Sequence, residues 1–217
     1  MNGNMVTQNT TLRMKATKRA ISLRRPVYGV GINDAWYMVV YEQNGVKIKC
    51  PYYAAWRYML QRCYQEKYLD SRPTYRGCSV CDEWLIFSNF KLWMEKQDFL
   101  GKELDKDILI PGNKIYSPDA CAFVNRHVNA LLNDHSSARG KYPTGVHLEK
   151  ARGKFRAKCS VEGRQVHIGY FDSPKIASGA YSKFKAKEVR RVAKSQEKHI
   201  KNGLLRHAAI IEKSVMK

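Results

Sequence analysis

Three cations occupy alternate positions near the C-terminal end of the chain. Lys154, Arg156 and Lys158 are separated by single apolar residues. Since successive side chains of a β-strand point to opposite faces, one face of this strand would be cationic and the other would pack on a core. Like charges on one strand face repel one another unless an anion receives them. The pattern predicts a sheet face that binds a polyanion, and the alternative is an ordinary solvated face.

A three-stranded antiparallel sheet packed on one helix is expected to position these cations. Turn residues separate three strand-like segments, 145–149, 154–160 and 165–171. Asp172-Ser173-Pro174 then supplies an N-cap and a proline at the first helical position, which predicts the start of a helix. A sheet of this width can enter the major groove of duplex DNA.

The charge of the whole chain favours the same class of ligand. The 217 residues include 39 Lys and Arg against 19 Asp and Glu, which gives a formal charge of +20. Of these, 19 cations and 6 acidic residues lie from Lys141 onward. An excess of this size is typical of nucleic-acid-binding proteins. We expect double-stranded DNA as the partner, no membrane and no small-molecule substrate, and the sequence leaves protein partners open.

The N-terminal half predicts a mixed α/β module. Segments 27–32 and 36–41 are strand-like, and Asn44-Gly45 predicts a two-residue hairpin turn. The spacing of Trp56, Met59, Leu60 and Cys63 predicts an amphipathic helix, and a second helix is expected over 88–96.

The cysteines allow two interpretations. The first 25 residues lack the sustained apolar segment of a secretory signal, so the six cysteines are expected to be reduced and the protein cytoplasmic. Cys78 and Cys81 have the spacing of a zinc-binding pair, and Cys50 and Cys63 would complete a four-cysteine zinc site. Alternatively, Cys63 is a buried thiol on an apolar helix face.

The residues of the predicted sheet form a recognisable pattern: Tyr142-x-x-Gly145-Val146, Gly153-Lys154-Phe155-x-Ala157 and the run from His167 to Ser173. This pattern resembles the DNA-binding domain of plant ethylene-response factors (APETALA type), in which a three-stranded sheet contacts the major groove. The resemblance implies a set of DNA-contacting positions. They are His147, Glu149, Lys154, Arg156, Lys158, Ser160, Gln165 and His167, with Arg152 and Arg164 in the adjoining turns. His167 stands where the family has an indole, so the family's sequence preference does not carry over.

A second pattern covers the preceding residues: Tyr53-x-x-Trp56, Cys78-x-Val80-Cys81-x-Glu83-Trp84, Leu104-Asp105-Lys106-Asp107 and Gly112-Asn113-Lys114. It resembles bacteriophage proteins of the HNH homing-endonuclease group, many of which carry the same sheet module behind the nuclease. The resemblance implies an α+β fold with a degenerate HNH-like strand-strand-helix element, and the cytoplasm of a host cell if the protein is phage-encoded.

An HNH site needs a histidine to activate water, an asparagine to fix the loop and a further side chain to hold a divalent metal on the scissile phosphate. Asp105-Lys106-Asp107 stands where that histidine would be. The resemblance implies Asp105, Asp107 and Asn129 as the catalytic set, with Asp107 and Asn129 holding Mg²⁺ or Mn²⁺. The alternatives are a solvated turn at the two aspartates and a non-catalytic regulator or nuclease inhibitor on the same scaffold.

RNA is a weaker candidate ligand, because Tyr170 and Phe171 are expected to be at least half buried and thus unable to form a stacking platform.

The expected organisation of the chain has five parts. They are a flexible basic arm (1–26), an HNH-like mixed module (27–135), a linker (136–141), a three-strand-plus-helix DNA-binding domain (142–190) and a basic helical tail (191–217) interrupted at Asn202-Gly203.

Overall fold

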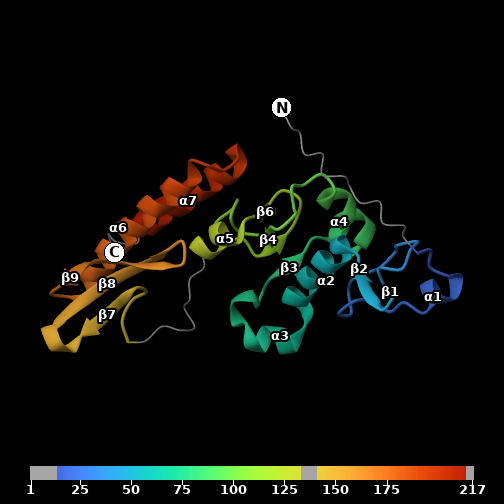
Figure 1. Cartoon of the computed structure of the whole chain (residues 1–217), viewed down its shortest axis with the longest axis horizontal. Coiled ribbons are helices and arrows are strands. Elements are labelled where there is room, and N and C mark those ends of the chain that lie inside the picture. Colours follow the sequence, from blue (N-terminus) through green and yellow to red (C-terminus); the bar gives the residue numbers. More distant parts are fainter. Residues whose placement is uncertain (1–13, 133–140, 214–217) are drawn as a thin grey trace. The chain divides into compact units, whose positions relative to one another are not determined.

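The computed structural model describes residues 14–132 and 141–213, which fall into two compact units divided between Gln97 and Asp98 (Figure 1). The fold is α+β with small antiparallel sheets, as the sequence predicts. Most of the expected linker, 136–141, lies outside the described residues. No helix among the described residues is long and apolar enough to cross a membrane.

The N-terminal unit is mainly helical. Its elements are α1 (Lys18–Ser22), β1 (Val40–Gln43), β2 (Val46–Lys49), α2 (Pro51–Tyr64), α3 (Glu66–Ser71), η1 (Pro73–Tyr75), β3 (Ser79–Val80), η2 (Asp82–Leu85) and α4 (Phe87–Met94). The predicted hairpin turn is confirmed, because β1 pairs with β2 and both Asn44 and Gly45 adopt the positive φ that this turn requires.

The core of this unit is aromatic. The predicted apolar stripe of α2 is buried, and Trp56 within it is completely buried. Its indole Nε1 donates a hydrogen bond of 2.6 Å to the carbonyl oxygen of Trp84. The ring centroid of Trp56 also lies 5.5 Å from that of Phe87, at the start of α4. The helices therefore meet around one indole whose polar atom is satisfied.

Two predictions for the N-terminal segment are wrong. Residues 27–32 form a tight turn and not a strand, because Tyr28 and Gly29 adopt positive φ and Val27 pairs with Gly31. The expected flexible arm is also structured over residues 14–26: it contains α1, and the Arg24 guanidinium donates hydrogen bonds to the carbonyl oxygens of Asn33, Ala35 and Tyr37.

The C-terminal unit joins a strand-strand-helix element to a three-stranded sheet and two helices. Its elements are β4 (Glu103–Asp105), β5 (Ile115–Tyr116), β6 (Ala122–Val124), α5 (Arg126–Leu132), β7 (Val146–Glu149), η4 (Lys150–Arg152), β8 (Lys154–Val161), β9 (Arg164–Phe171), α6 (Pro174–Ala193) and α7 (Lys198–Lys213). β4 pairs antiparallel with β6, and β7, β8 and β9 form the predicted antiparallel sheet.

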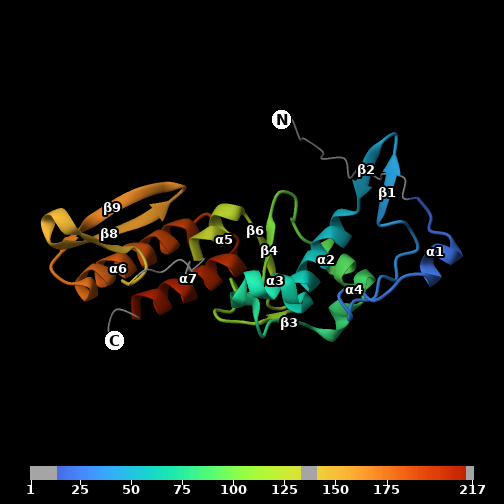
Figure 2. The ribbon, with the colours of Figure 1, turned by 90° about the horizontal axis from the view of Figure 1, so that it is seen from below.

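The helix α6 lies along one face of the β7–β9 sheet, with α7 beside it (Figure 2). It begins as predicted: the Ser173 hydroxyl accepts a hydrogen bond from the backbone N–H of Ile176, and Pro174 is the first helical residue. Val146, Ala157 and Ala177 are buried between the sheet and α6. The opposite face of the sheet therefore points away from this core.

The C-terminal helices also complete the core of the strand-strand-helix element. Val124 and Val128 pack in one cluster with Val189 of α6 and Leu204 of α7. The expected interruption at Asn202-Gly203 is wrong, because α7 runs through both residues. Gly203 is buried there against the backbone of Ile108. Thus the basic tail is an integral part of this unit.

Candidate functional site

The face of the β7–β9 sheet that points away from α6 gathers the predicted DNA-contacting residues. We call it the cationic face and define it by His147, Glu149, Lys154, Arg156, Lys158, Ser160, Gln165, His167 and Tyr170. The strand register places His147 opposite Arg156, and Lys158 opposite His167. Between these positions on β8, Ala157 is completely buried on the α6 side. The alternation of cationic and apolar residues in the sequence therefore matches the alternation of outward-facing and buried side chains along β8.

Tyr170 joins this face because of a β-bulge. The register shifts between Ala157 and Lys158, so that His167 lies opposite Lys158 while Tyr170 lies opposite Arg156. Tyr170 is 36% exposed, so it is more than half buried, as expected, although it lies on the cationic face. Strict alternation would have turned it inward. The signal for the bulge was Gly169, since an isolated glycine in a strand often marks one.

Tyr170 lies between two of the predicted residues. The guanidinium carbon of Arg152 lies 4.8 Å from the centroid of the Tyr170 ring, and the His167 ring centroid lies 4.7 Å from it. Arg152 belongs to η4, in the turn between β7 and β8. The turn and the third strand are thus linked across the edge of the cationic face by a cation–π contact and a ring contact.

The cations of this face are only partly neutralised. Arg156 Nη1 lies 3.3 Å from Glu149 Oε2, and Lys154 Nζ lies 3.2 Å from Asp172 Oδ1. The side chains of both pairs are at least a third exposed, so each pair contributes only about 0–1 kcal/mol and can exchange for another anion. Lys158 forms no ion pair among the described residues.

Histidine 147 lies beside the cations of β8. Its partial burial, and then the positive charges of Lys158 and Arg156, lower the pKa of His147 below the usual value for histidine. The side chain is therefore neutral at pH 7. It can donate or accept a hydrogen bond on the cationic face without adding charge.

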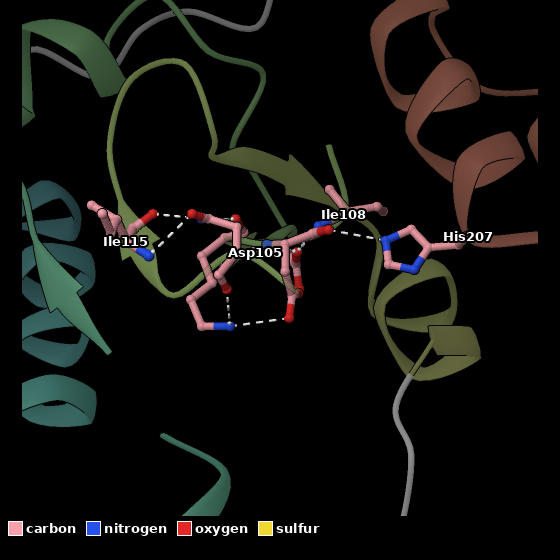
Figure 3. Close-up of polar contacts among 7 residues, drawn as sticks. Asp105, Ile108, Ile115 and His207 are labelled. Atoms are coloured by element: carbon pink, nitrogen blue, oxygen red, sulfur yellow. Dashed lines mark hydrogen bonds and ion pairs between the residues drawn. The ribbon is translucent and has the colours of Figure 1, made fainter. Parts of the chain in front are cut away.

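The strand-strand-helix element contains the predicted catalytic residues, and Figure 3 shows the polar contacts of its loop. Asp105 ends β4, and its Oδ1 accepts hydrogen bonds from the backbone N–H groups of Asp107 (2.9 Å) and Ile108 (2.7 Å). This local cap replaces the ladder bonds of a strand, and for this reason β4 stops at Asp105.

Burial, and then the charge of the neighbouring Asp107, raise the pKa of Asp105 to about 6. This value lies above the pKa of about 3.9 of aspartic acid in an unfolded chain. Between these two pKa values, the carboxyl of Asp105 is protonated in the folded protein and ionised in the unfolded chain. The contribution of Asp105 to stability is therefore fully present below about pH 4 and is lost as the pH rises through 6.

We expect Asp105→Asn to remove this dependence, because the amide oxygen can accept the same two backbone hydrogen bonds without ionising. Relative to wild type, the variant should gain about 2–3 kcal/mol of unfolding free energy between pH 4 and pH 7.5. Urea unfolding of both proteins at the two pH values measures this gain. A difference that does not change with pH would contradict the assignment.

Asp107 and its neighbour Lys106 are part of the same loop. Lys106 is only 8% exposed, and its Nζ lies 3.0 Å from Asp107 Oδ2 and 3.1 Å from the carbonyl oxygen of Asn113. The Asn113 amide in turn donates hydrogen bonds of 2.6 Å to the carbonyl oxygens of Lys106 and Ile115. Asn113 therefore closes the loop, a role that the sequence analysis did not assign to it.

The third predicted catalytic residue, Asn129, is engaged elsewhere. Its Nδ2 donates a hydrogen bond of 2.7 Å to Glu103 Oε2, at the start of β4. Within residues 14–132 and 141–213, no hydrogen bond joins Asn129 to Asp105 or Asp107, and no group of three His, Cys, Asp or Glu could hold a metal ion. The structure thus links the two aspartates through the turn that follows β4, whereas the Asn129 amide is bonded to Glu103.

A further contact of this loop comes from the far end of the chain. His207 Nε2, on α7, lies 2.9 Å from the carbonyl oxygen of Asp107 (Figure 3). Arg206 also donates to the carbonyl oxygen of Leu109. Since about a hundred residues separate these partners, no local sequence signal could have revealed the contacts.

The cysteines of the predicted zinc site differ in their surroundings. Cys63 and Cys78 are buried, whereas Cys50 and Cys81 are partly exposed. The Cys50 thiol lies 3.5 Å from the Tyr37 hydroxyl, and burial raises the pKa of Cys81. Among the residues that the structure describes, no three of these cysteines form a group that could hold a metal ion.

Comparison with known proteins gives no relative: no family model, no curated protein and no solved structure matches this chain.

Proposed function

We propose that this protein binds double-stranded DNA through the cationic face of the β7–β9 sheet. The observation that carries the proposal is the register, which places Arg156 beside His147 and Tyr170, and Lys158 beside His167. The cations are attracted by the phosphates of DNA, and the polar side chains can form hydrogen bonds with base edges in the major groove. The overall charge of +20 supports the same ligand.

Lysine footprinting tests the location of the contact. The full chain is acetylated with and without a saturating duplex, and the modified lysines are identified by mass spectrometry. We expect the duplex to protect Lys154 and Lys158 on the sheet, but not the exposed Lys183 and Lys187 of α6. Equal modification of Lys154 and Lys158 with and without DNA would contradict the proposal.

The contacts of the predicted catalytic residues favour a role in binding without cleavage. Asp105 caps a turn, Asp107 is paired with Lys106, and Asn129 is bonded to Glu103. Each of these side chains thus has a structural task in the element that supports α7. We propose that the element is a scaffold for the C-terminal unit.

A nicking assay on supercoiled DNA distinguishes the two roles. We expect no metal-dependent nicking by the purified protein with Mg²⁺ or Mn²⁺. Nicking that Asp107→Ala abolishes, with duplex affinity unchanged, would contradict the scaffold role and support a nuclease site at this loop.

A further inference from the structure

A second aromatic and basic surface lies on the N-terminal unit. Three tyrosines from different elements meet there: Tyr58 of α2, Tyr68 of α3 and Tyr75 of η1, which we call the tyrosine cluster. The ring centroids of Tyr58 and Tyr68 are 6.2 Å apart, and those of Tyr68 and Tyr75 are 5.8 Å apart, both edge to face. The hydroxyls of Tyr58 and Tyr68 are 3.5 Å apart. The cluster therefore forms one continuous surface.

An arginine lies within the cluster. The guanidinium carbon of Arg62 lies 4.4 Å from the ring centroid of Tyr58 and 5.5 Å from that of Tyr75. Tyr58 and Arg62 are four residues apart on α2, on the side of the helix away from the buried Met59 and Cys63. Tyr58 is nevertheless 46% exposed, so the cluster is not a part of the core.

The charge around the cluster is positive. The acidic residues of α3, Glu66 and Asp70, both lie within ion-pair distance of Arg76. Arg72 is exposed and forms no ion pair among the described residues. The backbone N–H of Arg72 donates to the carbonyl oxygen of Tyr68, and its carbonyl oxygen accepts from the N–H of Tyr75, so Arg72 lies between two residues of the cluster. The hydrogen bond from Tyr68 first, and then the charges of Arg62 and Arg72 against burial, lower the pKa of Tyr58.

The exposed ring of Tyr58, with the exposed cation of Arg72 nearby, suits a nucleic-acid strand whose bases are unstacked. A base can stack on a tyrosine ring while the arginines attract the flanking phosphates. A duplex does not offer this contact, because its bases are already stacked on one another.

We infer that the tyrosine cluster, with Arg72, is a binding surface for single-stranded DNA, separate from the cationic face that contacts the duplex. This inference rests on the proposed function in one respect, namely that DNA is the ligand of the chain. It adds a second form of DNA and assigns it to the N-terminal unit.

The test measures the binding of the full chain to labelled oligothymidylate and to a labelled duplex by fluorescence anisotropy. The double variant Tyr58→Ala, Arg72→Ala should lower the affinity for oligothymidylate about 5- to 150-fold, the range expected for the loss of one stacked base. Its affinity for the duplex should be unchanged. Tyr58→Phe should retain the affinity for oligothymidylate, because the ring is kept.

The matched control is Leu92→Ala, Lys96→Ala, which removes one exposed apolar side chain and one exposed cation from the same unit. It should bind both ligands like wild type. If oligothymidylate binds the Tyr58 and Arg72 variant as tightly as wild type while the duplex still binds, this inference alone fails. If wild type binds neither ligand, the proposed function fails as well.

Discussion

Replacing both Arg156 and Lys158 by alanine should lower the affinity for duplex DNA at least about 30-fold, because each lost contact to a base or phosphate costs about 1–3 kcal/mol. Both side chains lie on the cationic face, whereas the neighbouring Ala157 and Cys159 are buried toward α6. The variant should therefore unfold at the same denaturant concentration as wild type. Fluorescence anisotropy with a labelled duplex, together with urea unfolding, measures both effects.

The matched control removes the same number of cations from α6, where Lys183 and Lys187 are exposed one helical turn apart. Lys183→Ala, Lys187→Ala lowers the net charge equally but leaves the cationic face intact. We expect a small loss of affinity, due to long-range attraction alone. Equal losses in the two double variants would mean that the total charge, and not this face, determines binding.

Gly203→Ala should destabilise the protein by about 1–3 kcal/mol, although alanine is the better helix former by about 1 kcal/mol. A Cβ at this position would overlap the carbonyl oxygen of Ile108, and a backbone atom cannot move aside as a flexible side chain would. The helix α7 would have to shift away from the core that it shares with Val124 and Val128. Urea unfolding monitored by circular dichroism measures the change.

The neighbouring residue provides the control for this prediction. Asn202 is exposed on the same helix, so Asn202→Ala should leave stability unchanged or raise it by a few tenths of a kcal/mol through helix propensity. If Gly203→Ala proved as stable as Asn202→Ala, the close approach of α7 to Ile108 would be wrong.

The sequence predicted the structure correctly where an element depends on residues close to one another in the chain. Three local features are present as predicted: the apolar stripe on α2 around Trp56, the turn at Asn44-Gly45 and the cap of α6 at Ser173. Each depends only on residues a few positions apart. The alternation along β8 likewise placed Arg156 and Lys158 on one face.

The predictions were wrong where the structure depends on an unusual backbone conformation or on residues far away in the sequence. Positive φ at Tyr28 and Gly29 turns an apolar segment that has a strand-like composition. The bulge in β9 places Tyr170 on the cationic face, whereas strict alternation would have turned it inward. Gly203 indicated a helix break by its propensity, but the structure uses the missing Cβ for close packing against Ile108, far away in the sequence.

The candidate catalytic set shows the same limit. Asp105 and Asp107 are close in sequence and also in space, where the carboxylate of Asp105 caps the turn that contains Asp107. Asn129 was assigned by its position in a pattern, and its actual partner, Glu103, lies 26 residues earlier in the chain. Spacing alone could not distinguish these two arrangements.

The salt dependence of duplex binding tests the central claim most directly. If the cationic face and its turns neutralise roughly five phosphates, the logarithm of the binding constant should fall with the logarithm of the salt concentration with a slope of about −4 to −5, since each phosphate contributes about −0.9. Arg156→Ala, Lys158→Ala should reduce the steepness by about 2. A wild-type slope shallower than about −1, the equivalent of a single phosphate contact, would contradict DNA as the main ligand.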